Sequence, residues 1–214
     1  MWLKVEGIGF SYSNTRPLLF SGVTGVFRSG ELVAVTGPSG VGKSTLLEVL
    51  GGVRRPTHGR LLLSDDETGV RSQADHVDAC AWVLQNNPVF SHRTVLENVT
   101  IGLRARGADP QDARDRSRRA LASLGLRDFE MADIDSLSGG ERQRVTIARC
   151  IASPSVVLLA DEPTGNLDVK NTVRVVRCLR RAAESQKIVF VATHDPAVEG
   201  MCDRSVRLEG GEST

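Results

Sequence analysis

The sequence has 214 residues and a mass of 23.1 kDa, a length that suits one compact domain and excludes a machine of several domains. Hydrophobic residues make up 40% and charged residues 25%, which excludes the apolar-poor composition of a disordered chain. The 27 lysines and arginines offset 26 aspartates and glutamates to leave a net charge of +1, so no global field draws the chain onto nucleic acid or an anionic membrane. Any such contact has to be local.

Cysteine spacing and hydropathy bear on metal sites, disulfides and membrane segments. The four cysteines show no C-x-x-C spacing, so we expect reduced thiols rather than a zinc site or a disulfide scaffold. The first residues lack the basic and apolar regions of a leader, and no apolar run approaches the roughly 20 residues that span a bilayer. We therefore expect a soluble, cytosolic chain.

The first part of the chain predicts a small sheet followed by a strand, a loop and a helix. Residues 2–10 and 18–27 partly alternate apolar with small or polar residues and are rich in Val, Ile and Phe, as half-buried antiparallel strands are. Residues 31–36 form a short apolar run that stops at a glycine-rich turn, and helical spacing resumes over residues 44–50.

The middle of the chain predicts helices. After a strand-like segment at residues 79–84, two helices are expected at residues 94–104 and 112–124, with a loop at residues 107–110 between them. A further helical pattern covers residues 142–152. Acidic residues alternate with the arginines of this region, so we interpret its charged surface as a solvated one.

Two continuous apolar runs follow, at residues 156–160 and 187–193. Such runs are typical of strands that are covered on both faces of a parallel sheet. Together with residues 31–36 they predict an α/β core into which the helical lobe is inserted.

Residues 37–45, GPSGVGKST, match the pattern G-x-x-x-x-G-K-[ST] between a predicted strand and a predicted helix, the context that the motif needs. Glycines let successive N–H groups face inward at a helix N-terminus, where they form a nest for phosphate oxygens. Lys43 can then reach the β and γ phosphates, and the Ser44 hydroxyl can bind Mg²⁺. The predicted nucleotide-binding residues of this loop are Gly37, Pro38, Ser39, Gly40, Val41, Gly42, Lys43, Ser44 and Thr45.

Two acidic residues, Asp161 and Glu162, stand at the end of the apolar run 156–160. A buried strand delivers such side chains to its carboxyl end, where ligands of open α/β sheets bind. Asp161 can hold Mg²⁺ through water, and Glu162 can orient and deprotonate an attacking water. Paired acids at a strand end can also be a solvated turn or a helix cap, but the neighbouring phosphate loop favours the functional interpretation.

Residues 137–143, LSGGERQ, are the most informative stretch. By itself a Ser-Gly-Gly turn before a helix could be an N-cap and nothing more. The chain closely resembles the ATP-binding cassette (ABC) family, whose signature is this string, and the resemblance covers essentially the whole chain. It implies a P-loop NTPase with a RecA-like parallel core, an antiparallel β subdomain and an inserted α-helical subdomain at about residues 86–152, all in one nucleotide-binding domain of residues 1–214.

The resemblance also implies roles for residues that mean little alone. Tyr12 looks like the aromatic residue that stacks on adenine, and Gln85 resembles the glutamine that senses Mg²⁺ and the γ-phosphate. Residues 166–168 match the loop that communicates across the dimer through Asp168, and His194 matches the switch histidine after the last core strand. The catalytic residues so implied are Lys43, Gln85, Glu162 and His194, and the metal ligands are Ser44, Gln85 and Asp161.

The signature further implies a partner. In this family the helix start of one subunit, here Ser138, Gly139, Gly140 and Glu141, faces the γ-phosphate that the other subunit's P-loop holds. One P-loop and one signature per chain therefore predict a homodimer, or a heterodimer with a similar cassette, around two ATP molecules. The expected reaction is the hydrolysis of ATP to ADP and phosphate.

Residues 160–168, ADEPTGNLD, give a clue to the subgroup. They resemble the lipoprotein-releasing, macrolide-efflux and cell-division ATPases, which implies an integral membrane permease subunit, a peripheral position on the cytoplasmic face of the membrane, and an export or force-transmitting role. Residues 131–136 lack the proline often found there, and residues 64–80 are unusually acidic and polar. An importer ATPase therefore stays open as an alternative.

Other classes fit the sequence less well. A soluble ABC ATPase that acts on nucleic acid or ribosomes would need coiled-coil arms, zinc spacings or a second cassette, none of which the sequence contains. A small kinase that shares the P-loop would not explain residues 137–143. We expect no nucleic-acid partner.

Overall fold

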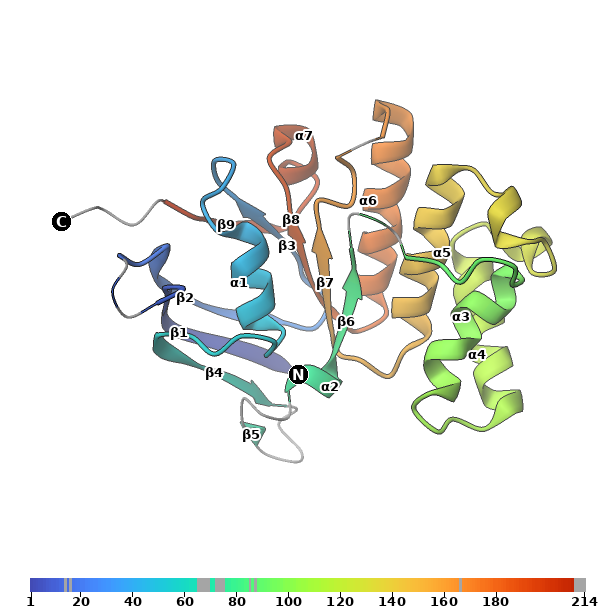
Figure 1. Ribbon diagram of the computed structural model, residues 1–214, viewed down its shortest axis with the longest axis horizontal. Coiled ribbons are helices and arrows are strands. Elements are labelled where there is room, and N and C mark those ends of the chain that lie inside the picture. Colours follow the sequence, from blue (N-terminus) through green and yellow to red (C-terminus); the bar gives the residue numbers. More distant parts are fainter. Residues whose placement is uncertain are drawn as a thin grey trace.

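A parallel sheet with strand order β6-β7-β8-β3-β9 forms the centre of the fold (Figure 1). The structure is a computed structural model that describes residues 1–13, 15, 17–64, 70–71, 76–84, 86, 88–165 and 167–209. The strands of the parallel sheet are β3 (Leu32–Thr36), β6 (Cys80–Val83), β7 (Val157–Asp161), β8 (Ile188–Ala192) and β9 (Arg204–Arg207). The three apolar runs of the sequence are β3, β7 and β8, and their apolar residues are all buried.

The period-2 geometry of these strands explains why the runs are continuously apolar. Side chains such as Val33 and Phe190 point to one face of the sheet, where they join the core with α1 (Lys43–Leu50) and the antiparallel sheet. Their neighbours Leu32 and Val189 point to the other face, where they join the core with the larger helices. Both faces are covered, so each residue of the run is buried.

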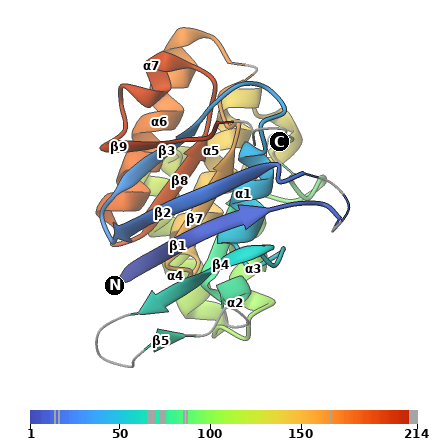
Figure 2. The same cartoon turned by 90° about the vertical axis from the view of Figure 1, so that its left-hand side faces the viewer.

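The antiparallel sheet has the strand order β2-β1-β4-β5 and faces the viewer in Figure 2. Its strands are β1 (Trp2–Phe10), β2 (Phe20–Arg28), β4 (His58–Ser64) and β5 (Val70–Arg71). The two strands predicted at residues 2–10 and 18–27 are confirmed, although β2 begins at Phe20. Leu3 of β1 pairs with Phe27 on one side and Leu63 on the other, and all three side chains are buried.

On the other face of the parallel sheet, α6 (Val169–Glu184) and α5 (Gly139–Ala152) lie side by side, and α3 (Val95–Arg104) and α4 (Pro110–Ser123) lie beyond them (Figure 1). Shorter elements complete the described chain: α2 (His76–Ala79), η2 (Arg127–Phe129), η3 (Ile134–Ser136) and α7 (Pro196–Glu199). The helices α3, α4 and α5 share one buried core with α6.

The helix starts are set by capping side chains. Thr94 accepts a hydrogen bond from the N–H of Glu97, whose carboxylate accepts one from the N–H of Thr94, so α3 begins with a reciprocal capping box. Asp109 caps α4 through the N–H groups of Gln111 and Asp112, and Pro110 occupies the first helical position. Because of this cap, α4 begins at Pro110 rather than at residue 112 as predicted.

Two further observations concern the cysteines and the helices of the described part of the chain. Cys80, Cys150, Cys178 and Cys202 are free thiols. Across the described ranges, no helix is both long enough and apolar enough to cross a bilayer.

Phe190 joins the two sheets and provides a test of this packing. Its ring meets Phe27 of β2 edge to face at a centroid distance of 4.8 Å, and both side chains are almost fully buried. We expect Phe190→Ala to lower the free energy of unfolding by about 3–5 kcal/mol, because it removes this contact and leaves a cavity. Urea unfolding followed by circular dichroism measures the change.

Phe129→Ala is the matched control, because that ring is 37% exposed on η2 and away from both sheets. We expect it to cost less than about 1 kcal/mol. Equal losses in the two variants would contradict the role assigned to the contact between the sheets.

Candidate functional site

The carboxyl ends of three parallel strands meet at one edge of the central sheet, and the predicted catalytic residues follow those ends. Ala192 at the end of β8 is in register with Val35 of β3 and with Asp161 of β7. Backbone hydrogen bonds continue past the strands, from Glu162 N–H to the Ala192 carbonyl and from Thr193 N–H to the Val35 carbonyl. The parallel sheet therefore brings segments far apart in the sequence to the edge where ligands of such sheets bind.

The loop between β3 and α1 needs glycine at two positions. Gly42 stands directly before α1 with a φ of 104°, a left-handed conformation that side chains disfavour. Gly37 has a φ of 144°, and a Cβ atom there would lie 2.6 Å from the Leu208 carbonyl oxygen. Pro38, Ser39 and Gly40 form the exposed rim of the loop.

Lys43 stands at the first turn of α1 and is only 8% exposed. Its ammonium group donates hydrogen bonds to the carbonyls of Gly37 (3.1 Å) and Pro38 (3.2 Å) and lies 3.8 Å from Glu162 Oε1. Burial makes this charge costly, and the carbonyls and the carboxylate offset part of that cost. The loop thus curls around a positive charge, the arrangement expected of a site that receives phosphates.

Ser44 and Asp161 place a hydroxyl beside a carboxylate. The Ser44 hydroxyl donates to Asp161 Oδ1 at 3.0 Å. Burial raises the pKa of Asp161, and the hydrogen bond from Ser44 opposes that rise in part. A partly buried carboxylate and an adjacent hydroxyl are hard oxygen ligands of the kind that Mg²⁺ prefers, so the described residues fit this metal.

Glu162 and His194 are brought together across the ends of β7 and β8. Glu162 Oε1 lies 3.0 Å from His194 Nδ1, and the imidazole is largely exposed. Glu162 also adopts a φ of 44°, in the left-handed region. Such a conformation costs roughly 1–3 kcal/mol for a residue with a side chain, and strain of this kind clusters at functional sites.

Tyr12 follows the end of β1 and lies beside the loop. Its hydroxyl is 2.7 Å from Thr45 Oγ1, its ring packs edge to face on Phe10 at 5.2 Å, and the residue is 55% exposed. The guanidinium of Arg54 lies 5.3 Å from the Tyr12 ring centroid. The sequence predicts Tyr12 and Thr45 as nucleotide-binding residues but gives no signal for Arg54, because only the fold brings it to the ring.

The signature residues form a separate group. Ser138 caps α5 in a reciprocal capping box with Glu141: its N–H and hydroxyl donate to Glu141 Oε2 at 2.9 and 2.6 Å. The helix therefore begins at Gly139, before the predicted start at residue 142, and a Cβ added to Gly139 would meet no atom within 4 Å. Among the described residues, no hydrogen bond or ion pair joins Ser138–Glu141 to the P-loop.

Asp168 belongs with the signature group. It caps α6 by accepting from the N–H of Asn171 at 2.8 Å and from its side-chain amide at 2.9 Å. A Cβ added to Gly140 would lie 3.4 Å from Asn171 Oδ1, so the starts of α5 and α6 are adjacent. Gln85 and Asn166, the other residues predicted for these loops, lie outside the described residues.

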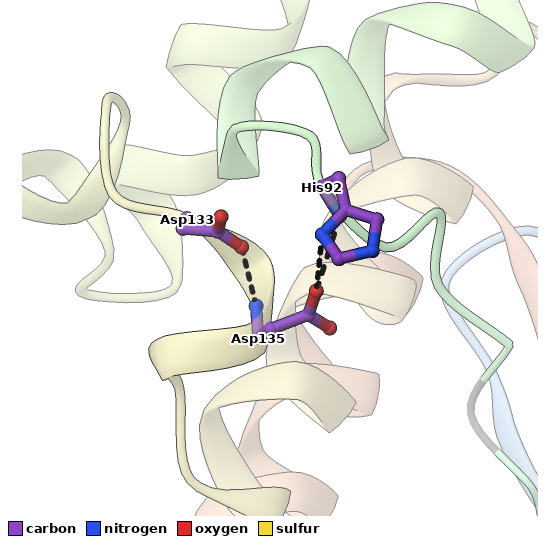
Figure 3. Close-up of side chains that lie close together, drawn as sticks. All are labelled: His92, Asp133 and Asp135. Atoms are coloured by element: carbon purple, nitrogen blue, oxygen red, sulfur yellow. Dashed lines mark hydrogen bonds and ion pairs between the residues drawn. The ribbon is translucent and has the colours of Figure 1, made fainter.

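A further group of titratable side chains, His92, Asp133 and Asp135, gathers on the helical lobe (Figure 3). Asp135 Oδ2 accepts from the backbone N–H of His92 at 3.1 Å and lies 3.7 Å from His92 Nδ1. Asp133 Oδ1 accepts a hydrogen bond from the N–H of Asp135. The backbones of Thr94 and Asp133 form an isolated antiparallel β-bridge. All three side chains are exposed, and their contacts tie the segment before α3 to the segment that leads into Ser138.

The fold and the geometry together define a P-loop ATPase. The family model described as "ABC transporter" matches residues 20–165. The chain therefore belongs to the ABC transporter family, and ATP hydrolysis is its reaction.

Similar proteins agree with this assignment. The lipoprotein-releasing system ATP-binding protein LolD 1 of Rhodopseudomonas palustris is 35% identical over 98% of this chain and 97% of its own length. The macrolide export ATP-binding/permease protein MacB of Bartonella henselae is 38% identical over 86% of this chain, which spans 29% of that relative's length. Both names fall in the subgroup that residues 160–168 resemble.

Solved structures with the same fold include cbiO1 of Clostridium perfringens, part of the ABC transporter complex cbiONQ, with a TM-score of 0.85, 28% identity, and coverage of 98% of this chain and 85% of that one. A dimeric structure of the bacterial ABC transporter cassette MJ0796 has a TM-score of 0.76 and 30% identity, and covers 98% of this chain and 95% of that one. A second structure of that cassette is a dimer in a post-hydrolysis state bound to ADP and Pi.

The capping box at Ser138 predicts a pH dependence. Hydrogen bonds from the hydroxyl and then the N–H of Ser138 lower the pKa of Glu141 below its ordinary value. A carboxyl whose pKa is lowered by folding adds stability above its unfolded pKa, about 4.3, and loses it as the pH falls through the folded pKa. We expect Glu141→Gln to lower the free energy of unfolding by about 0.5 kcal/mol at pH 7 and by less near pH 3.

Urea unfolding at the two pH values measures this difference. Glu184→Gln removes the same charge at the exposed end of α6 and serves as the control, for which the stability should follow the pH as in the wild type. A loss at Glu141→Gln that persists unchanged near pH 3 would contradict the charged capping box.

Proposed function

We propose that this chain is the ATP-hydrolysing subunit of a membrane transporter of the export or force-transmitting type, and that it dimerises around two Mg-ATP. The observation that carries the proposal is the division of the predicted residues into two groups. Lys43, Asp161, Glu162 and His194 meet at the sheet edge, whereas the exposed residues Ser138 and Gly139 begin α5 away from it. Each group supplies one half of a phosphate site.

The sheet-edge residues fit hydrolysis of a terminal phosphate. The backbone of residues 37–42 and the Lys43 ammonium hold the phosphates, with Thr45 and Tyr12 beside them. Ser44 and Asp161, with Gln85, would hold Mg²⁺, which when bound neutralises charge on the phosphate oxygens. Glu162 orients and deprotonates the attacking water, and His194 orients Glu162 through the 3.0 Å contact.

The signature residues act on the partner's nucleotide in this proposal. The α5 N-terminus carries a partial positive charge that favours anions, and Ser138, Gly139, Gly140 and Glu141 present it at an exposed surface. Asp168 caps the adjacent α6, and in this proposal it belongs to the loop that communicates between the two subunits. A ligand that bridges two surfaces stabilises their association, and hydrolysis removes that bridge.

The membrane role is supported by the relatives. LolD 1 is named as the ATP-binding protein of a lipoprotein-releasing system and matches the chain over nearly its whole length. MacB is named as an ATP-binding and permease protein, and this chain corresponds to 29% of it. We infer that the chain is one cassette domain with a helical subdomain at residues 86–152, held at the cytoplasmic face of the membrane by a permease subunit, with no nucleic-acid partner.

The dimer is tested by separating binding from hydrolysis. Glu162→Gln keeps the shape of the side chain but removes the base, so we expect ATP turnover to fall by at least about 100-fold while Mg-ATP converts the variant from monomer to dimer on size-exclusion chromatography. Lys43→Ala is the contrast, because it should lose ATP binding and form no dimer.

Adding Ser138→Arg to Glu162→Gln tests the shared site. The arginine blocks the surface that faces the partner, so we expect the ATP-dependent dimer to disappear while the ATP affinity of the monomer stays within about twofold, well under 1 kcal/mol. A large loss of monomer affinity would place Ser138 in its own chain's nucleotide site. A Glu162→Gln variant that stays monomeric with Mg-ATP would contradict the dimer.

The membrane partner is tested by recovering the tagged chain from gently solubilised native membranes and identifying what comes with it. We expect a few-span subunit with a large extracytoplasmic domain, recovered equally with Lys43→Ala, because that loop lies at the sheet edge rather than on the lobe. A many-span subunit would favour an ordinary transport channel or an importer, and recovery of soluble partners alone would overturn the membrane role.

A further inference from the structure

An open pocket of about 360 Å³ lies between α5 and α6, beside the turn that follows α4. Figure 1 shows these two helices side by side. The pocket is lined by four arginines, one cysteine and the end of α4: Arg144, Arg174, Arg177, Arg181, Cys178, Leu124 and Gly125. We refer to it as the arginine pocket.

The helix geometry gathers these charges. Arg174, Arg177 and Arg181 follow the spacing i, i+3 and i+7 on α6, so their side chains leave one stripe of the helix. Arg144 reaches the same space from α5. The lining contains no acidic residue, and burial raises the pKa of the Cys178 thiol to about 11, so the thiol stays neutral.

The four guanidinium groups are uncompensated within the described part of the chain. Other arginines pair with carboxylates, as Arg180 does with Asp203 and Arg118 with Glu130 at 3.1 Å. No hydrogen bond or ion pair of a described residue involves the side chain of any arginine in the pocket. The charge of Arg144 helps to lower the pKa of Glu141, one turn earlier on α5. The two side chains form no ion pair.

Such a cluster is unfavourable by itself. Like charges three or four residues apart on a helix repel each other and destabilise it. The net charge of the chain is only +1, so the cluster is a local feature and not a consequence of a basic protein. An anion in the pocket would remove the repulsion and satisfy the unpaired donors.

We propose that the arginine pocket binds a compact anion that carries two or more phosphate groups. Arginine presents a planar pair of donors that matches phosphate oxygens, and the four positive charges around one pocket exceed the charge of about −2 that a single phosphate carries. The volume is at the lower end of small-ligand pockets. The lining has no aromatic side chain, so recognition rests on the phosphates and not on a base.

The anion would contact α5 and α6 at the same time and hold the two helices together. It bridges Arg144 of α5 to the arginines of α6, and these helices begin at the caps Ser138 and Asp168 of the candidate site. The arginine pocket shares no residue with the sheet-edge site. The proposal is therefore independent of which residues hydrolyse ATP.

Binding is tested with inorganic pyrophosphate by isothermal titration calorimetry without Mg²⁺. The host is Lys43→Ala, which weakens competing binding at the P-loop. In that host, Arg174→Gln with Arg177→Gln removes two guanidinium groups, and we expect pyrophosphate to bind at least about tenfold more weakly, because charge-assisted hydrogen bonds to the phosphates are lost.

The matched control is Arg28→Gln with Arg207→Gln in the same host. These exposed arginines at the ends of β2 and β9 are outside the pocket, and their loss changes the net charge equally. We expect the control to bind pyrophosphate within about twofold of the host, a difference of about 0.4 kcal/mol or less. Equal weakening in both pairs, or in neither, would overturn the proposal.

Thermal unfolding shows that the pocket variant still folds. Without anion we expect it to melt at or above the host temperature, because repulsion is relieved, and pyrophosphate should raise the melting temperature of the host but not of the pocket variant. A pocket variant that melts lower than the host, and a host that pyrophosphate does not stabilise, would contradict an uncompensated anion site.

A second arm identifies the source of the phosphates. The host and the two variants are sedimented with vesicles that contain cardiolipin and with neutral vesicles. Binding to cardiolipin vesicles that the pocket variant loses, in addition to binding of pyrophosphate, would assign the site to lipid headgroups, whereas binding of pyrophosphate without binding of vesicles would assign it to a soluble anion. Absence of both overturns the proposal.

Discussion

The contact between the Lys43 ammonium and the Glu162 carboxylate, 3.8 Å apart and largely shielded from water, is the constraint around which the site is built. It requires the loop after β3 and the end of β7 to meet, which only the parallel register of β3, β8 and β7 achieves. Because water has little access to this contact, the attraction between the two charges is screened less than it would be at an exposed surface. The buried faces of the central sheet therefore serve to hold two opposite charges at a fixed separation.

At the same sheet edge, the adjacent carboxylates Asp161 and Glu162 have different surroundings. Asp161 accepts a hydrogen bond from Ser44, and burial raises its pKa, whereas Glu162 contacts His194 and Lys43. One carboxylate is thus suited to a metal and the other to a proton, although they are adjacent in the sequence. The division coincides with the end of β7, because Asp161 is its last residue and Glu162 follows in a left-handed conformation.

Contiguous motifs and buried strands could be predicted from the sequence, because their signals lie within a few residues. The loop 37–45 and the apolar runs are of this kind. The start of α5 was placed three residues late, because glycine disfavours a helix interior while the Ser138–Glu141 box still stabilises its first turn. The contacts of Tyr12 with Thr45 and Arg54, and of Glu162 with His194, could not be predicted, because they depend on the packing of separate elements.

The left-handed backbone at Glu162 sets a limit on how far this protein can be stabilised without harm. Glycine would adopt that conformation with little strain, so replacing the residue would free roughly 1–3 kcal/mol that the native chain stores there. The same replacement would delete the carboxylate that contacts His194 and that we propose as the catalytic base. At this position, the substitution that would raise the free energy of unfolding would also remove the proposed base. Stability and ATP turnover therefore make opposite demands on this one residue.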